Sequence, residues 1–363
     1  MELGIIGLAR SGKTSLFNAV TRGSALIGEY SSGREPNVGV VHVPDERVDA
    51  MTAIFEPKRK VYAEIRWVDF PVAGFGVEGP GAQFLAQLSE LDALVHVVRA
   101  FEDASVPHDE GSVDAARDLE ALDLELTFAD LALIERRVSR IESEMRSLRA
   151  GERVDQERQL AIMRRMQSHL ESGAGLRSME FAASEQRELR NYRFVTLLPT
   201  LVVVNIDEDQ LADATSIEAR FSERYGGDAV EVATLSARVE AELAQMQPEE
   251  AAEFRSDLGL PPDSPLDRTI HAAYRLLGLH SFLTVGDDEC RAWPVQVGTT
   301  APEAAGKIHS DLERGFIRAE VASWTDIVEA GSLAALRRAG KLRTEGKSYV
   351  VQDGDVLNIL FNV

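Results

Sequence analysis

Residues 7–14 of the chain read Gly-Leu-Ala-Arg-Ser-Gly-Lys-Thr and match the pattern G-x-x-x-x-G-K-[ST]. A short apolar run, residues 3–6, precedes them, and a helix-like run, residues 15–20, follows. In the order strand, glycine loop, helix, such a loop surrounds phosphate oxygens with backbone N–H groups, and the helix N-terminus adds positive potential. An ordinary glycine-rich turn is the alternative. The setting favours a nucleotide-binding α/β fold.

Three side chains have defined roles in such a site. Lys13 would neutralise the phosphates, and the Thr14 hydroxyl would be a ligand of Mg²⁺. Asp69 ends a second strand-like run, where a carboxylate would hold Mg²⁺ through water. An aspartate that simply ends a strand is the alternative for Asp69, but together with the loop it predicts a magnesium site.

Composition restricts the class of protein. The 363 residues, 44% of them hydrophobic and 27% charged, are typical of a soluble globular protein with two or three domains. No run approaches the roughly 20 apolar residues of a membrane span, and the N-terminus enters a strand without room for a signal peptide. The single cysteine, Cys290, fits a reducing, cytoplasmic environment. A net charge of −21 argues against DNA binding through the overall electrostatic field of the protein. A local basic patch is the alternative that net charge does not exclude.

Further apolar runs predict a mainly parallel sheet between helical layers. Two are continuous, residues 93–98 and 201–204, as expected for strands buried on both faces. The other predicted strands are 38–43, 61–68 and the weaker 229–234. Helical patterns separate several of these runs, so we predict a three-layer α/β domain.

Residues 115–192 have a different character. They contain no proline, alternate in charge sign, and place Ile134, Val138 and Ile141 at heptad-like spacing. We predict a coiled-coil-like helical hairpin inserted between two strands; a plain surface helix pair is the alternative. The predicted domain organisation is therefore a nucleotide-binding domain over 1–114 and 193–279 with the insert at 115–192.

The last 84 residues, 280–363, predict a separate small domain. After a helix at 266–277, strand-like runs occur at 291–297, 316–321 and 356–363. Thr300 is a candidate N-cap for a helix between the first two strands. Several strands and one helix in this length indicate a β-grasp-like fold.

Asn205, Ile206, Asp207 and Glu208 follow the strand at 200–204, where a nucleotide base would lie. In GTPases this position carries Asn-Lys-x-Asp, whose aspartate accepts hydrogen bonds from N1–H and the 2-amino group of guanine. Adenine has no N1–H, so a strict guanine-binding aspartate would have no hydrogen bond to accept from it. Here the fourth residue is Glu208 and the lysine is absent, and this change argues against strict guanine recognition. Ser236 and Ala237, after the last predicted strand, would place a backbone N–H near the base.

With these features the chain resembles the YchF branch of the Obg-related NTPases, the Obg-like ATPases. The resemblance extends over the whole chain and is strongest at 291–293, 301–302, 305–311, 313–317 and 349–356, with further matches at 35–40 and 236–243. It implies a P-loop G domain, a coiled-coil insert and a C-terminal TGS domain. It also implies Mg²⁺-dependent binding and slow hydrolysis of ATP in preference to GTP, a switch function, and association with ribosomes or translation factors. By position, it assigns phosphate contacts to residues 10–15 (Arg10, Ser11, Gly12, Lys13, Thr14 and Ser15) and a base contact to Ile206.

The chain departs from the family pattern in its catalytic parts. The family's switch threonine falls on Gly33, beside Ser31 and Ser32, so a hydroxyl ligand of Mg²⁺ is either supplied by Ser32 or lost. The second switch, Asp-x-x-Gly in the family, has Val72 in place of glycine. These changes leave two alternatives open: a nucleotide-binding scaffold with little turnover, and, less favoured because of Glu208, a GTPase.

The phosphate-binding loop departs as well. Ala9, Arg10 and Ser11 stand where the family has Pro, Asn and Val. In related cation-dependent NTPases this Asn helps to bind a monovalent cation, and Arg10 would supply that charge covalently as an internal arginine finger. A solvated arginine on the outside of the loop is the alternative.

Overall fold

The computed structural model describes residues 1–23, 36–70, 75–76, 79–108, 111–147, 153–189, 192–257, 260 and 264–362. Contacts divide the chain into two compact units. The first comprises Met1–Gly39 and Arg66–Ala272, and the second Val40–Ile65 and Ala273–Val363. The sequence did not indicate that residues 40–65 group with the C-terminal part. The four predicted domain ranges remain a prediction.

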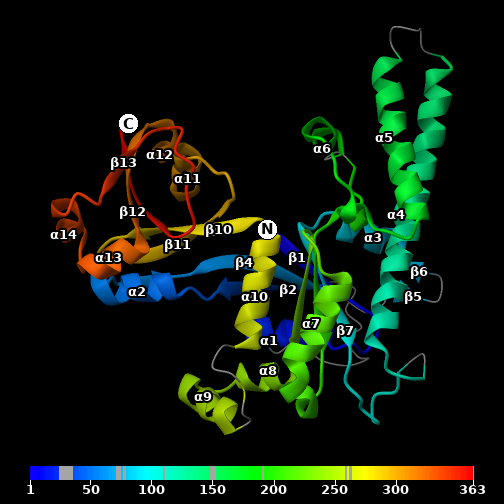
Figure 1. Ribbon diagram of the computed structural model, residues 1–363, viewed down its shortest axis with the longest axis horizontal. Coiled ribbons are helices and arrows are strands. Elements are labelled where there is room, and N and C mark those ends of the chain that lie inside the picture. The colour runs from blue at the N-terminus through cyan, green and yellow to red at the C-terminus, as the bar shows by residue number, and fades with distance from the viewer. Residues whose placement is uncertain are drawn as a thin grey trace. The chain divides into compact units, whose positions relative to one another are not determined.

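One sheet has the strand order β2-β4-β1-β7-β8-β9. It lies mostly in the first unit, while β2 and β4 run across the boundaries at residues 39/40 and 65/66. Figure 1 labels β2, β4, β1 and β7. Strands β4, β1, β7, β8 and β9 pair in parallel, which confirms the predicted strand direction. The strand bounds are Glu2–Ile6 (β1), Asn37–Val43 (β2), Ala63–Asp69 (β4), Ala93–Arg99 (β7), Thr200–Asn205 (β8) and Val230–Leu235 (β9).

Helices cover the sheet on both faces. Apolar residues of α3 (Ala82–Leu88), α4 (Ala115–Met145) and α7 (Ala214–Tyr225) pack on one face. Helices α1 (Lys13–Thr21) and α8 (Ala237–Leu243) pack together on the other. Every residue of β7 and β8 is buried, as their continuous apolar runs predicted. The predicted three-layer α/β fold is confirmed.

Helix α4 and the following α5 (Val154–Glu171) run side by side as a hairpin (Figure 1). Ile134, Val138 and Ile141 of α4 are buried against Ile162 and Met166 of α5, so the predicted seam forms the hairpin core. Short elements follow: η3 (Leu176–Ser178), α6 (Ala183–Leu189) and η4 (Val195–Leu197). After β8, η5 (Glu208–Asp213) leads to α7, and α9 (Pro248–Asp257) and α10 (Pro265–Leu276) follow α8. A short hairpin of β5 (Phe75–Gly76) and β6 (Gly79–Pro80) precedes α3.

The second unit contains a mixed sheet in the order β13-β12-β14-β10-β11-β3. Strand β10 pairs antiparallel with β11 and parallel with β14, and β12 pairs antiparallel with β14. Apolar residues of α11 (Ala301–Ile308) pack in its core together with residues of the strands. The β-grasp fold stays a prediction. The strand bounds are Arg59–Val61 (β3), Leu279–Val285 (β10), Glu289–Gln296 (β11), Phe316–Ser323 (β12), Arg343–Glu345 (β13) and Asp355–Phe361 (β14).

Remaining helices of this unit are α2 (Glu46–Phe55), α12 (Ser310–Arg314), α13 (Trp324–Ala330) and α14 (Leu333–Arg338). Thr300 and Glu303 form a capping box at the start of α11, as expected for an N-cap threonine. In the part of the chain that the structure describes, no helix combines the length and apolarity needed to cross a bilayer.

Candidate nucleotide-binding site

The loop between β1 and α1 has the backbone that its glycines predict. Gly7 and Gly12 have φ values of 149° and 93°, in the region that favours glycine. A Cβ atom at Gly7 would lie 2.3 Å from the Val97 carbonyl oxygen, and one at Gly12 would lie 2.1 Å from Asn205 Nδ2. Both positions are therefore restricted by space as well as by φ. The N-terminus of α1, where phosphate would bind, begins directly after Gly12.

Lys13 lies inside this loop, and its Nζ donates to the carbonyl oxygens of Gly7 at 2.9 Å and Leu8 at 2.7 Å. Its side chain is buried, and burial lowers the pKa of Lys13 to about 8, although the nearby Asp69 carboxylate acts in the opposite direction. A phosphate bound at the neighbouring amides would favour the charged form of Lys13, because its negative charge offsets the cost of burying the ammonium group.

Asp69 and Thr14 meet at the predicted magnesium position. Thr14 Oγ1 donates to Asp69 Oδ2 at 2.9 Å, and Asn37 Nδ2 donates to the same oxygen at 3.2 Å. The other oxygen, Oδ1, is buried and has no hydrogen-bond partner in the described residues. Burial raises the pKa of Asp69, while the hydrogen bonds from Thr14 and Asn37 and the Lys13 charge lower it.

These oxygens fit a magnesium ion. Mg²⁺ prefers a few hard oxygen ligands and completes its shell with water and phosphate, and a hydroxyl beside a carboxylate with an unused oxygen supplies that chemistry. Among the described residues there is no cluster of three or more His, Cys, Asp or Glu side chains that would hold a metal alone. The donor set therefore fits an ion that arrives with a nucleotide.

Asn205 connects the two sides of the predicted base site. Its Nδ2 donates to the Ser11 carbonyl oxygen at 2.9 Å, and its Oδ1 accepts from Ala237 N–H at 2.9 Å. The Asn205 side chain is buried and both ends of its amide are engaged. It thus fixes the phosphate-binding loop against the start of α8, a bridging role that sequence reasoning did not assign to it.

The other predicted base residues lie near one another at the ends of β8 and β9. Ile206 is buried, and Ser236 is the N-cap of α8. Glu208 is exposed, with Oε2 3.8 Å from Arg238 Nη2. The exposed Glu208 carboxylate, near Arg238, is available to contact a base. That it does so stays a prediction.

Within the phosphate-binding loop, Ser11 is buried, Ser15 lies partly buried in the first turn of α1, and Arg10 has a positive φ of 62°. The Arg10 guanidinium donates from Nη1 to the Pro107 carbonyl oxygen at 3.1 Å, in the segment after β7. The predicted switch positions Ser31, Ser32, Gly33 and Val72 lie outside the described residues.

Sequence reasoning missed two polar residues near the loop. Asn37 directly contacts Asp69, and its place just after the first switch region could have indicated this. His96 is buried on β7, and neither ring nitrogen has a partner among the described residues. Burial lowers the pKa of His96 to about 4. Its occurrence inside an otherwise apolar strand, residues 93–98, was a visible signal.

Comparisons with known proteins agree with this geometry. The family model YchF-GTPase_C, described as "Protein of unknown function (DUF933)", matches residues 279–362. "Ribosome-binding ATPase YchF" of Bacillus subtilis (strain 168) is 40% identical over 369 residues, which cover 100% of both chains. The protein of the same name from Escherichia coli O157:H7 is 38% identical over 100% of this chain and 99% of its own. The chain belongs to the YchF family.

A solved structure extends the likeness to the fold of the YchF family. "Structure of the Schizosaccharomyces pombe YchF GTPase" superposes with a TM-score of 0.85 and 31% identity, over 99% of this chain and 97% of that chain. The P-loop G-domain fold with a helical insert, predicted from the sequence, is thereby confirmed. The names of these relatives differ in the nucleotide, since the bacterial proteins are called ATPases and the yeast protein a GTPase.

Proposed function

We propose that this YchF-family chain binds ATP with Mg²⁺, hydrolyses it slowly, and acts as a nucleotide-dependent switch that associates with the ribosome in the cytoplasm. The observation that carries the proposal is the arrangement of Lys13, Thr14 and Asp69 around a glycine loop at the N-terminus of α1. The names of the bacterial relatives support the choice of ATP and of the ribosome. We also infer that the C-terminal sheet unit is a TGS domain.

The chain's own residues would divide the work as follows. Loop amides and Lys13 would hold the phosphate tail, and Thr14 and Asp69 would hold the metal, which when bound would neutralise phosphate charge. Arg10, Ser11, Gly12 and Ser15 would border the phosphates by position. Asn205 would keep the loop in place, while Ile206, Glu208, Ser236 and Ala237 would face the base. No general base is assigned, so positioning must supply the catalysis, and turnover is expected to be slow.

Calorimetry with ATP, ADP and GTP in the presence of Mg²⁺ tests nucleotide binding. We expect ATP to bind more tightly than GTP, and Lys13→Ala to weaken ATP binding at least tenfold, because a buried charge contact to phosphate is lost. Lys58→Ala is the matched control, since Lys58 is a highly exposed lysine of the other unit. Equal ATP affinity in the two variants, or a tenfold preference for GTP, would contradict the proposal.

Thr14→Ala tests the metal site separately. Because it removes a hydroxyl that contacts Asp69, we expect the Mg²⁺ concentration required for ATP turnover to rise several-fold. A Mg²⁺ titration of turnover checks this, with Thr21→Ala as control, because the Thr21 hydroxyl donates to the Phe17 carbonyl oxygen within α1. Identical Mg²⁺ curves for Thr14→Ala and wild type would exclude Thr14 as a ligand.

The second candidate is a scaffold that binds nucleotide without appreciable turnover, and the substitutions at Gly33 and Val72 favour it. A single-turnover assay with excess protein over labelled ATP distinguishes the two. Release of phosphate within minutes to hours supports the ATPase, whereas bound and intact ATP supports the scaffold. Co-sedimentation with ribosomes, with and without a non-hydrolysable ATP analogue, tests the proposed partner.

A further inference from the structure

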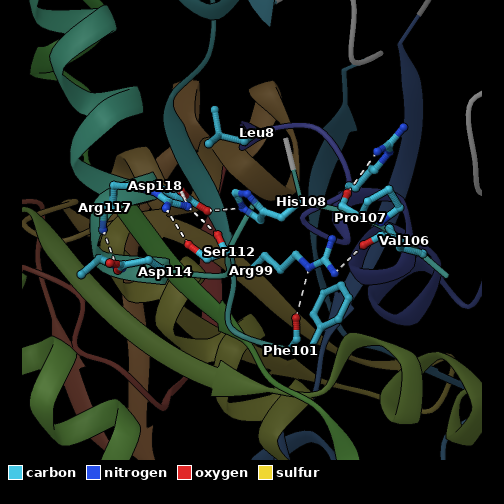
Figure 2. Close-up of polar contacts among 12 residues, drawn as sticks. Leu8, Arg99, Phe101, Val106, Pro107, His108, Ser112, Asp114, Arg117 and Asp118 are labelled. Atoms are coloured by element: carbon cyan, nitrogen blue, oxygen red, sulfur yellow. Dashed lines mark hydrogen bonds and ion pairs between the residues drawn. The ribbon is translucent and has the colours of Figure 1, made fainter. Parts of the chain in front are cut away.

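The segment after β7 connects the phosphate-binding loop to the inserted helical hairpin. Residues 100–114 leave the end of β7, where Arg99 is buried, and enter α4, whose N-cap is Asp114. Figure 2 shows the polar contacts that hold the described part of this segment. They come from β7, from the phosphate-binding loop and from α4.

Two neighbouring carbonyl groups of the segment are held by different elements. Arg99 of β7 donates from Nη2 to the Val106 carbonyl oxygen at 2.7 Å and from Nε to that of Phe101 at 3.1 Å (Figure 2). The next carbonyl, that of Pro107, accepts from Arg10 Nη1 at 3.1 Å. Arg99 belongs to a buried strand, so it fixes the segment to the sheet, whereas Arg10 fixes it to the loop that would bind nucleotide.

The residue after Pro107 continues the connection into α4. His108 Nε2 lies 2.7 Å from Asp118 Oδ2, and both side chains are largely buried (Figure 2). Asp118 belongs to the first turn of α4, where its other oxygen accepts two hydrogen bonds from Arg117. Arg117 in turn donates to the Ser112 carbonyl oxygen at 2.8 Å. A continuous set of contacts therefore runs from Arg10 to the base of the hairpin.

Arg10 is an unusual residue for its backbone position. Its φ of 62° is left-handed, which disfavours residues other than glycine, asparagine and aspartate. Strained backbone of this kind is retained where a local function requires the side chain. Arginine is long enough to reach Pro107, while the asparagine of the family pattern would fit the backbone without that reach.

We propose that Arg10 is a positioning residue that ties the phosphate-binding loop to residues 101–108 and, through His108 and Asp118, to the first turn of α4. The base of the hairpin is the first turn of α4, the part nearest in sequence to β7. Nucleotide bound by the loop would thereby reduce the mobility of this base. This inference rests on the proposed nucleotide binding, but the contacts that form the link lie within the chain and can be tested by themselves.

Hydrogen exchange followed by mass spectrometry on the full chain tests this. Arg10→Asn removes the reach but keeps a residue that tolerates positive φ, and Arg10→Lys keeps a donor of similar length. Without nucleotide, we expect amides of residues 101–118 to exchange about fivefold faster in Arg10→Asn than in wild type, and Arg10→Lys to restore much of the protection. Arg22→Asn is the control, because Arg22 is an exposed arginine of the same unit with a positive φ of 50°.

The second arm adds a saturating non-hydrolysable ATP analogue with Mg²⁺. In wild type, exchange should slow both in residues 7–14 and in residues 101–122, and in Arg10→Asn only the first change should persist. If the nucleotide analogue slows exchange in both segments of Arg10→Asn, or leaves the exchange of residues 101–122 unchanged in wild type, the proposal is overturned. Unchanged exchange of 101–118 in nucleotide-free Arg10→Asn overturns it as well. If no variant shows slowing at 7–14, the proposed nucleotide binding has failed, and the nucleotide-free arm still decides the link.

A potassium titration separates this role from that of an arginine finger. Arg10→Ala is used here, because asparagine at this position could itself bind K⁺. If Arg10 supplies charge to the phosphates, K⁺ should restore the turnover that Arg10→Ala loses, since the ion would replace the guanidinium. If Arg10 positions residues 101–108, K⁺ should leave both turnover and the exchange pattern of the variant unchanged. Rescue by K⁺ with wild-type exchange at 101–118 overturns the positioning role.

Discussion

Gly12→Ala is the sharpest test of how the phosphate-binding loop is held. The new Cβ would lie 2.1 Å from Asn205 Nδ2, a distance that real Cβ atoms do not adopt. Asn205 is buried and holds Ser11 and Ala237 through its amide, so it cannot move without losing those hydrogen bonds. The substitution therefore acts on two elements that are far apart in sequence.

The expected cost follows from these contacts. Alanine at a φ of 93° costs about 1–2 kcal/mol relative to glycine. Displacing Asn205 loses two buried hydrogen bonds at about 1 kcal/mol each. Gly12→Ala should thus lower the free energy of unfolding by about 3 kcal/mol, and Asn205→Ala alone by about 2 kcal/mol.

The double variant distinguishes a clash from a general weakening. With Asn205 shortened to alanine the methyl group at position 12 has room, so the double variant should cost about 3 kcal/mol rather than the additive 5 kcal/mol. Urea unfolding followed by Trp67 fluorescence measures this for the first unit, where Trp67 is fully buried, once Trp293 and Trp324 are replaced by Phe. Additive costs would refute the reasoning, because they would mean that the Cβ at position 12 does not meet Asn205.

Other predictions concern buried polar groups. Asp130 of α4 is fully buried and accepts from Val195 N–H, Thr196 N–H and the Thr196 hydroxyl, so Asp130→Ala should cost about 3 kcal/mol in urea unfolding and Thr196→Val only about 1. Burial raises the pKa of Asp130, so on acidification the native state is protonated at Asp130 before the unfolded state is. The unfolding free energy of wild type relative to Asp130→Ala should therefore rise as the pH falls from the raised native pKa to the ordinary value of 3.8. The pKa of His96 is lowered from 6.5 to about 4, so on acidification the unfolded state is protonated at His96 before the native state is. The free energy of unfolding of wild type should therefore fall by up to about 3 kcal/mol between these pH values. His96→Phe should not show this loss. An unchanged acid profile in His96→Phe would show that His96 is not the group responsible.

The sequence predicted the nucleotide-binding unit well because its signals are local. The loop at 7–14 combines a strand, two required glycines and a helix within a short stretch, and the buried strands β7 and β8 are continuous apolar runs. Asp69 lies beside Thr14 because parallel strands bring their carboxyl ends to one edge, while its role as a metal ligand stays a prediction.

The second unit was harder to predict because its pairing is non-local. Strand β3 pairs with β11, which joins Arg59 to Glu289 across a separation of 230 residues. Residues 61–68 read as one strand, yet the structure has β3 and β4 in different sheets. In the first unit, the contacts of Asn205 were also missed, since a buried amide that joins a loop to the start of a helix leaves no periodic pattern in the sequence.

The geometry of the phosphate-binding loop explains where the chain can diverge from the family pattern. Gly7 and Gly12 are restricted both by positive φ and by neighbouring atoms at 2.3 Å and 2.1 Å, so no other residue fits either position without displacement. Arg10 has a positive φ, but its side chain reaches outward to Pro107 and can vary at a modest cost. Substitution at Arg10 therefore leaves in place the backbone amides that would bind phosphate. What it changes is the contact that the loop makes with the segment leading into α4. We therefore expect divergence at position 10 to alter the proposed coupling before it alters nucleotide binding.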